Sequence, residues 1–123
     1  MECGDCLLIP APGLGNTHLW IVITEPDPMC VIVNLTTLRG SRDQTVVLQS
    51  SDHPFIRHQT IVLYSDARLI NTESLEAEVR AGTAIMERPC PAHTLKLIQA
   101  GVFASPFTAR KIQNFCSTKK QSR

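Results

Sequence analysis

Short runs of aliphatic and β-branched residues, separated by turn-forming residues, fill the first seventy positions of the chain. Runs of this length and composition are typical of β-strands, and their close spacing predicts a small, strongly bent antiparallel barrel. A turn-rich segment at 10–16 follows the first run, and the proline-rich turn at 25–28 predicts a hairpin between the second and third. The predicted strands cover residues 6–9, 18–24, 30–35, 44–49 and 60–64.

The last fifty residues have helix signals instead. Asn71 or Thr72 can cap a helix that Gly82 ends, and Pro91 can open a second helix. Ser105 followed by proline predicts the start of a third helix. The sequence therefore predicts one α+β domain over residues 1–123. Its parts are a β-barrel at 4–70, helices at 71–116 and a polar, basic tail at 117–123.

The charge balance limits the classes of partner. Twelve Lys and Arg against eleven Asp and Glu give a formal charge of +1, so bulk electrostatics do not favour polyanions, and a nucleic-acid site must be local. No apolar run approaches the roughly 20 residues that span a bilayer, and the chain does not begin like a secretory signal. We therefore expect a cytoplasmic protein without a membrane contact.

The five cysteines occur at irregular spacing, which argues for reduced thiols and against a disulfide framework. Cys3-x-x-Cys6 and Cys90-x-x-His93 have the residue types of a zinc site. The two pairs lie far apart in the sequence, however, and Pro91 interrupts the second. Small buried cysteines explain the pattern better, and we predict no metal and no cofactor.

Histidine and arginine gather near the predicted strand ends. Cleavage of RNA needs an acceptor for the 2′-hydroxyl proton, a donor for the leaving oxygen and a cation for the phosphate. Histidine and arginine supply these groups without a carboxylate cluster for Mg²⁺. Such residues are also common on surfaces, so a non-catalytic binding module is the alternative. The group consists of His18, Thr36, Thr37, Arg39, Arg42, His53, Arg57, His58 and Arg68.

The order of these segments resembles PemK/MazF-type toxins over about residues 4–82. Gly4-Asp5 before the first strand and the apolar strand that begins at His18 are similar to the opening of that family. The strand at 31–37 ends in threonine, as the family's does, and residues 64–69 (YSDARL) are similar to a later family stretch that precedes a helix.

The resemblance implies an SH3-like barrel with appended helices, which acts as a homodimeric, metal-independent endoribonuclease on single-stranded RNA and is neutralised by an antitoxin protein. The family's threonine falls on Thr37, or on Thr36 if the register slips by one. Its arginine falls on His18, so either histidine serves as acid or base there or the site is inactive. The predicted catalytic residues are His18, Thr37, His53 and His58, and the predicted substrate-binding residues are Thr36, Arg39, Arg57 and Arg68.

Overall fold

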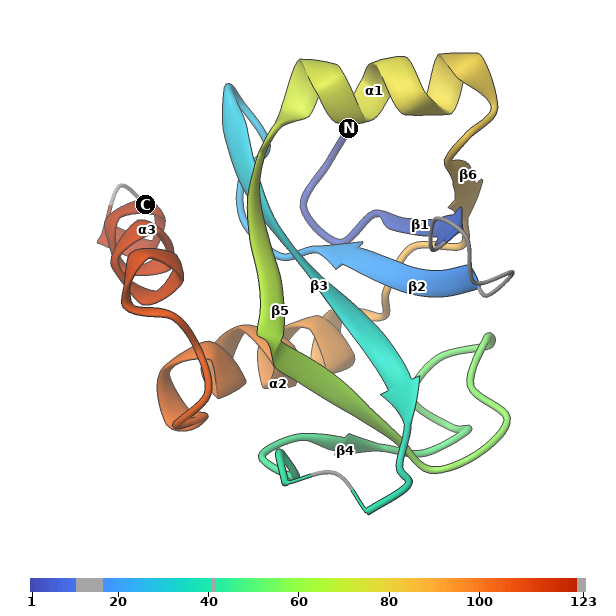
Figure 1. Cartoon of the computed structure of the whole chain (residues 1–123), viewed down its shortest axis with the longest axis vertical. Helices are drawn as coiled ribbons and strands as arrows, with labels where there is room; N and C mark the ends of the chain where they lie inside the picture. The colour runs from blue at the N-terminus through green and yellow to red at the C-terminus, as the bar shows by residue number, and fades with distance from the viewer. Residues whose placement is uncertain (11–16, 41, 122–123) are drawn as a thin grey trace.

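The computed structural model describes residues 1–10, 17–40 and 42–121. The described chain forms a six-stranded sheet with three helices, which confirms the predicted α+β class (Figure 1). Beyond Pro10, the turn predicted at 10–16 lies outside the described residues. The elements are β1 (Cys6–Pro10), β2 (Thr17–Val22), β3 (Met29–Thr37), β4 (Val47–Leu48), β5 (Thr60–Asn71), α1 (Thr72–Ala81), β6 (Ile85–Glu87), α2 (Ala92–Ala104) and α3 (Arg110–Gln121).

The sheet is antiparallel throughout, in the order β4-β5-β3-β2-β1-β6. The predicted hairpin is confirmed, because β2 pairs with β3 and Leu19 lies opposite Leu35. A register shift between Ile32 and Asn34 interrupts the long β3–β5 ladder, and such irregularities increase strand bending. Among the described residues the edge strands β4 and β6 do not pair, so the sheet is open and the predicted closure into a barrel is not confirmed.

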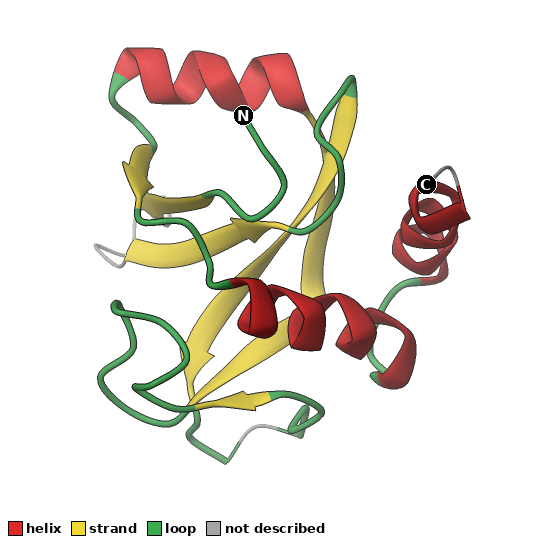
Figure 2. Ribbon diagram, turned by 180° about the vertical axis from the view of Figure 1, so that it is seen from behind, coloured by secondary structure: helices red, strands yellow, loops and turns green. Residues whose placement is uncertain are grey.

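Each face of the sheet carries a hydrophobic core, because alternate residues of a strand point to opposite faces. On β2, Trp20 and Val22 pack in the core beneath α1, whereas Leu19 and Ile21 pack in the core that α2 and α3 cover. Figures 1 and 2 show α1 over one side of the sheet and α2 on the other. The helix residues buried in these cores are Leu75 from α1, Ile98 and Val102 from α2, and Ile112 and Cys116 from α3.

Helix α1 has the predicted ends. The side chain of Asn71 accepts a hydrogen bond from the Ser74 amide at 3.1 Å. Gly82 ends the helix with φ of 81°, a left-handed conformation that glycine adopts at little cost. Helix α2 begins directly after Pro91, also as predicted. None of the described helices is long and apolar enough to cross a bilayer.

Two predicted boundaries in the C-terminal part are wrong. The third helix begins at Arg110 instead of at Ser105, because the Ser105 hydroxyl donates to Asp43 at 2.9 Å and accepts from the Phe107 amide at 3.1 Å. These bonds fix a turn between α2 and α3. The predicted tail from Ser117 onward is helical as far as Gln121, since Cys116 is buried and anchors this end of α3 in the core.

Helix α2 lies close against β5 at Gly101. The buried Tyr64 hydroxyl donates to the Ile98 carbonyl at 2.7 Å, which places the ring next to Gly101. A Cβ atom at position 101 would lie 2.6 Å from the Tyr64 Cζ and 2.7 Å from a methyl group of Val46. Glycine is therefore required for this contact, because real Cβ atoms do not approach other heavy atoms so closely.

Candidate functional site

A groove of about 870 Å³ opens beside the start of β2, the end of β3 and the loop that joins β4 to β5. The end of β6 forms part of its wall. In Figure 1 these segments lie on the right-hand side of the molecule. The groove brings together the histidine, threonine and arginine residues predicted from the sequence, with the exceptions of Arg42 and Arg68. These are His18, Thr36, Thr37, Arg39, His53, Arg57 and His58.

The β2–β3 register decides which threonine accompanies His18. Leu19 lies opposite Leu35, and one step further along the two strands His18 comes beside Thr36. Residues 36 and 37 point to opposite faces, so Thr37 shares a face with Leu35 and lies opposite Thr60 of β5. The strand register therefore places Thr36, and not Thr37, beside His18.

The groove has an excess of positive charge. Arg39, Arg57 and Arg88 line it, and all three side chains are exposed. Among the described residues that line the groove, Glu87 is the single acidic side chain. Guanidinium groups present paired donors that match the oxygens of a phosphate. The wall also includes Phe55, whose side chain is 44% exposed, and an exposed ring of this kind can stack on a nucleic-acid base.

His53 has a different role from the predicted one, because its ring is only 2% exposed and both nitrogens are occupied. Nδ1 accepts from the Phe55 amide at 3.0 Å, and Nε2 lies 3.3 Å from the Arg88 carbonyl. A neutral imidazole has one donor and one acceptor nitrogen. Because Nδ1 accepts, the proton lies on Nε2, which donates to the Arg88 carbonyl. His53 therefore fixes the position of the groove loop instead of exchanging protons with a substrate.

Further contacts hold this loop against the start of α2. The Thr94 hydroxyl donates to the Asp52 carbonyl at 2.7 Å, and Nε2 of His93 lies 3.5 Å from the Asp52 carboxylate. Ile56 is buried, which shows that this loop packs against the body of the protein. The groove wall is thus rigidly supported at its base, and the side chains of Arg57 and His58 remain exposed above it.

Burial lowers the pKa of His53 below the ordinary value of 6.5, which predicts a loss of stability in acid. Between the lowered pKa of the folded state and the ordinary pKa of the unfolded state, His53 binds a proton in the unfolded chain but not in the folded chain. The stability that comes from the neutral, buried ring is therefore fully present above pH 6.5 and is lost as the pH falls through the folded-state pKa. We expect urea unfolding at pH 5.5 to show a lower free energy than at pH 7.5. One group contributes at most about 1.4 kcal/mol per pH unit.

The matched control is His53→Gln, which keeps an amide donor but does not titrate. Its free energy of unfolding should differ less between the two pH values than that of the unmodified chain. An equal pH dependence in both proteins would contradict the assignment of His53 as a neutral, buried ring.

The cysteines do not form the zinc site that their spacing suggested as an alternative. The Cys6 thiol hydrogen-bonds to the Cys90 thiol, and this contact together with burial raises the pKa of Cys6 far above its ordinary value. Its sulfur also lies 3.5 Å from Nε2 of His53. The described residues contain no group of three or more His, Cys, Asp or Glu side chains arranged to hold a metal ion.

Arg68 lies outside the groove. Its guanidinium carbon lies 4.8 Å from the centre of the Trp20 ring, a cation–π geometry. Trp20 belongs to the core beneath α1, and Arg68 lies opposite Ile32 of that same core. The position that the family resemblance assigned to substrate binding therefore supports the sheet on the side of α1.

Glu87, Arg88 and Phe55 are groove residues that the sequence analysis missed. The first two lie at the end of β6, a three-residue strand that pairs with β1 from the opposite end of the chain. No short sequence motif indicates that β6 pairs with β1, because the two strands lie far apart in the sequence. Phe55 and Ile56 form an apolar pair in the groove loop, of which only Ile56 is buried. Comparison of the chain with models of known families and with curated proteins finds no match.

Proposed function

We propose that the groove binds single-stranded RNA and cleaves it without a metal ion. The observation that carries this proposal is the convergence of four separate chain segments on one groove with three arginines, two imidazoles that are not buried and an exposed aromatic ring. Arginines bind the phosphates. Phe55 supplies a stacking surface for an unpaired base, which a duplex would not offer.

The proposed reaction is attack of the 2′-hydroxyl on the adjacent phosphorus. One of His18 and His58 accepts the hydroxyl proton, and the other gives a proton to the departing 5′-oxygen. The P–O5′ bond breaks as the P–O2′ bond forms, which yields a 2′,3′-cyclic phosphate and a free 5′-hydroxyl. The groove arginines stabilise the negative charge that develops on the phosphoryl oxygens, and Thr36 and Thr37 orient the nucleotide.

The resemblance to PemK/MazF-type toxins supports the same activity. Under this proposal the open, bent sheet is a variant of the SH3-like barrel, the chain works as a cytoplasmic homodimer, and an antitoxin protein neutralises it. His18 then occupies the position of the family's arginine. Imidazole exchanges protons near neutral pH. Histidine in place of arginine at this position therefore replaces a permanently charged side chain with an acid or a base.

The test uses the purified chain with a single-stranded RNA of mixed sequence in excess EDTA. We expect cleavage, products that end in a cyclic phosphate, and no cleavage of DNA of the same sequence, because DNA lacks the 2′-hydroxyl. A duplex of the same RNA should be cut far more slowly. RNA that binds but stays intact would favour the alternative of a non-catalytic module, and cleavage of the DNA would contradict the proposed chemistry.

A further inference from the structure

Glu87 is an exception within the arginine-rich groove. Its side chain is half-buried in the wall, next to Arg88 in the sequence. Within the part of the chain that the structure describes, its carboxylate makes no hydrogen bond or ion pair. A negative charge in this place opposes the binding of phosphates. A carboxylate without a partner, in the wall of a binding groove, therefore indicates a ligand group that donates hydrogen bonds.

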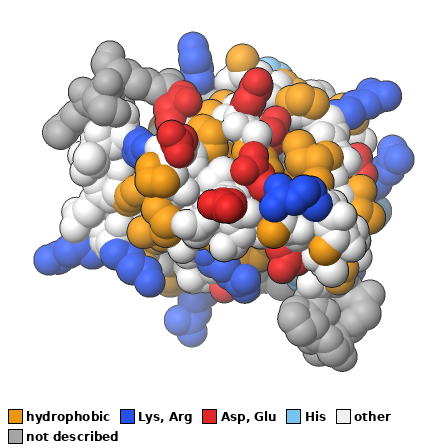
Figure 3. Space-filling view, turned by 90° about the horizontal axis from the view of Figure 1, so that it is seen from above, with side chains coloured by type: hydrophobic (Ala, Val, Ile, Leu, Met, Phe, Trp, Pro, Cys, Tyr) orange, Lys and Arg blue, Asp and Glu red, His pale blue; other side chains and the backbone are white. Residues whose placement is uncertain are grey.

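The acidic residues of α1 lie away from the groove. Glu73, Glu76 and Glu78 belong to this helix, and Figure 3 shows acidic side chains on the α1 face of the molecule. None of the three is among the described residues that line the groove. The position of Glu87 is therefore not the result of a generally acidic surface around it.

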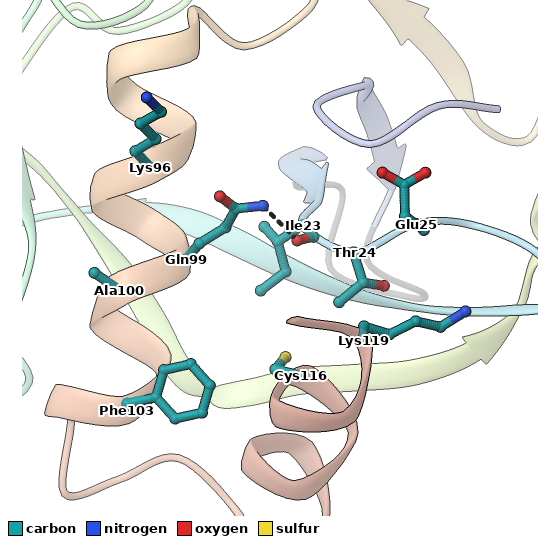
Figure 4. Close-up of a pocket in the computed structure, with 9 residues that line it drawn as sticks. All are labelled: Ile23, Thr24, Glu25, Lys96, Gln99, Ala100, Phe103, Cys116 and Lys119. Carbon is teal, nitrogen blue, oxygen red and sulfur yellow. Dashed lines mark hydrogen bonds between the residues drawn. The ribbon is translucent and has the colours of Figure 1, made fainter. Parts of the chain in front are cut away.

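A second hollow, of about 290 Å³, lies between α2, α3 and the segment after β2 (Figure 4). Its polar groups have partners within the chain. The Gln99 amide donates to the Ile23 carbonyl at 2.9 Å, and the Lys119 ammonium donates to the Asp27 carbonyl at 3.0 Å. Glu25, which also lines this hollow, takes part in an interaction within the chain as well. The groove differs from this hollow, because the Glu87 carboxylate is left to bind a ligand.

His53 holds Phe55 and the segment of Glu87 on two sides of one imidazole ring. Nδ1 accepts from the Phe55 amide at 3.0 Å, and Nε2 lies 3.3 Å from the carbonyl of Arg88, the residue that follows Glu87. Burial lowers the pKa of His53, and the Arg88 carbonyl and the charge of Glu87 act against this shift. The carboxylate is therefore near the ring, and the exposed Phe55 side chain and Glu87 belong to one part of the groove.

Guanine is the base whose hydrogen-bonding pattern matches a carboxylate. Its Watson–Crick edge presents two adjacent donors, N1–H and the 2-amino group, and a carboxylate offers two acceptor oxygens. Adenine and cytosine present one donor next to a ring nitrogen that accepts, and uracil presents one donor between two carbonyl oxygens. Each of these acceptors would repel a carboxylate. Unpaired RNA exposes this edge while the face of the base stacks on an aromatic side chain.

We propose that Glu87 makes the groove selective for guanosine. The guanine base stacks on Phe55, and its N1–H and 2-amino group donate to the Glu87 carboxylate. The inference rests on the proposed function, because it requires that the groove binds single-stranded RNA. A paired hydrogen bond of this kind discriminates against the wrong base by about tenfold or more.

The test measures the binding of labelled 2′-O-methyl oligonucleotides by fluorescence anisotropy. The methyl group blocks attack by the 2′-oxygen, so binding is measured without cleavage. Each probe is an oligouridine with a central guanosine, inosine, adenosine or cytidine. We expect the guanosine probe to bind at least about tenfold more tightly than the adenosine and cytidine probes. Inosine lacks the 2-amino group, so its probe should have an intermediate affinity.

Glu87→Gln should abolish the preference for guanosine, since an amide replaces one of the two acceptors with a donor. The plain oligouridine should bind this variant more tightly, because a negative charge has been removed from a groove that binds phosphates. Glu73→Gln makes the same chemical change on α1 and should alter neither affinity. Phe55→Ala should weaken binding of every probe by at least about fivefold, because stacking does not depend on the identity of the base.

The outcomes separate this inference from the proposed function. Equal binding of the guanosine and adenosine probes, or a guanosine preference that persists in Glu87→Gln, would overturn the inference alone. Failure of every probe to bind would overturn the proposed function together with it. If Glu87→Gln slowed the cleavage of all RNAs equally and left base preference unchanged, the carboxylate would be assigned to proton transfer instead.

Discussion

Replacing His18 with alanine is expected to lower the rate of RNA cleavage by about 10²–10⁴-fold, the usual effect of removing a general acid or base. His18 lines the groove beside Thr36, at the start of β2. Its side chain is partly exposed, so the substitution removes a functional group without opening a cavity in the core. The measurement is the single-turnover cleavage rate of a labelled RNA in EDTA.

His58→Ala should have an effect of the same order, because the reaction needs both an acid and a base. The double variant should be little slower than either single variant, since groups that act in one step are not additive. Lys111→Ala is the control. Lys111 is exposed on α3 and does not line the groove, and the cleavage rate of this variant should stay within about twofold of that of the unmodified chain. Unchanged rates in both groove variants would mean that the imidazoles are not the acid and base.

Gly101→Ala is expected to lower the free energy of unfolding by at least about 2 kcal/mol. In an exposed helix the same change stabilises by about 1 kcal/mol, so the sign is diagnostic of the contact with β5. The new methyl group would collide with the hydroxyl of Tyr64 and lie 2.6 Å from its Cζ. The Tyr64 ring is buried, so it cannot simply turn into solvent to relieve the contact. Urea unfolding followed by circular dichroism measures the change.

A double-mutant cycle identifies the cause. Tyr64→Phe alone loses the hydrogen bond to the Ile98 carbonyl and should destabilise by about 1 kcal/mol or more. Combined with Gly101→Ala, it also removes the oxygen atom that the new methyl group meets first. The double variant should therefore lose less stability than the sum of the two single variants. Strict additivity would show that the strain lies elsewhere.

Local sequence patterns predicted the strands and helices well where turn residues marked their ends. The turn at 25–28 indicated the β2–β3 hairpin, and Asn71 with Gly82 indicated the ends of α1. The same patterns predicted most of the groove, because His18 begins a strand and Thr37 ends one. Strand ends in an antiparallel hairpin lie together, so sequence spacing was sufficient here.

The remaining differences arise from contacts between distant parts of the chain. The burial of His53 depends on the carbonyl of Arg88 and the thiol of Cys6, neither of which is close to it in sequence. Arg68 follows an irregular stretch of the β3–β5 ladder and stacks on Trp20. A motif of a few residues cannot indicate on which side of a bent strand such an arginine lies.

The pairing of β1 with β6 has a consequence for the way the chain folds. Cys6 lies opposite Glu87, so β1 pairs with its second neighbouring strand only after residue 87 has been made. Contacts of such long sequence separation form slowly, because the intervening chain loses much entropy when they close. His53 then binds the carbonyl of Arg88, directly after that pair. A nascent chain that ends before β6 therefore has Arg39 and Arg57 but not the wall against which the groove loop is held, and it acquires the groove only after Arg88 has been made.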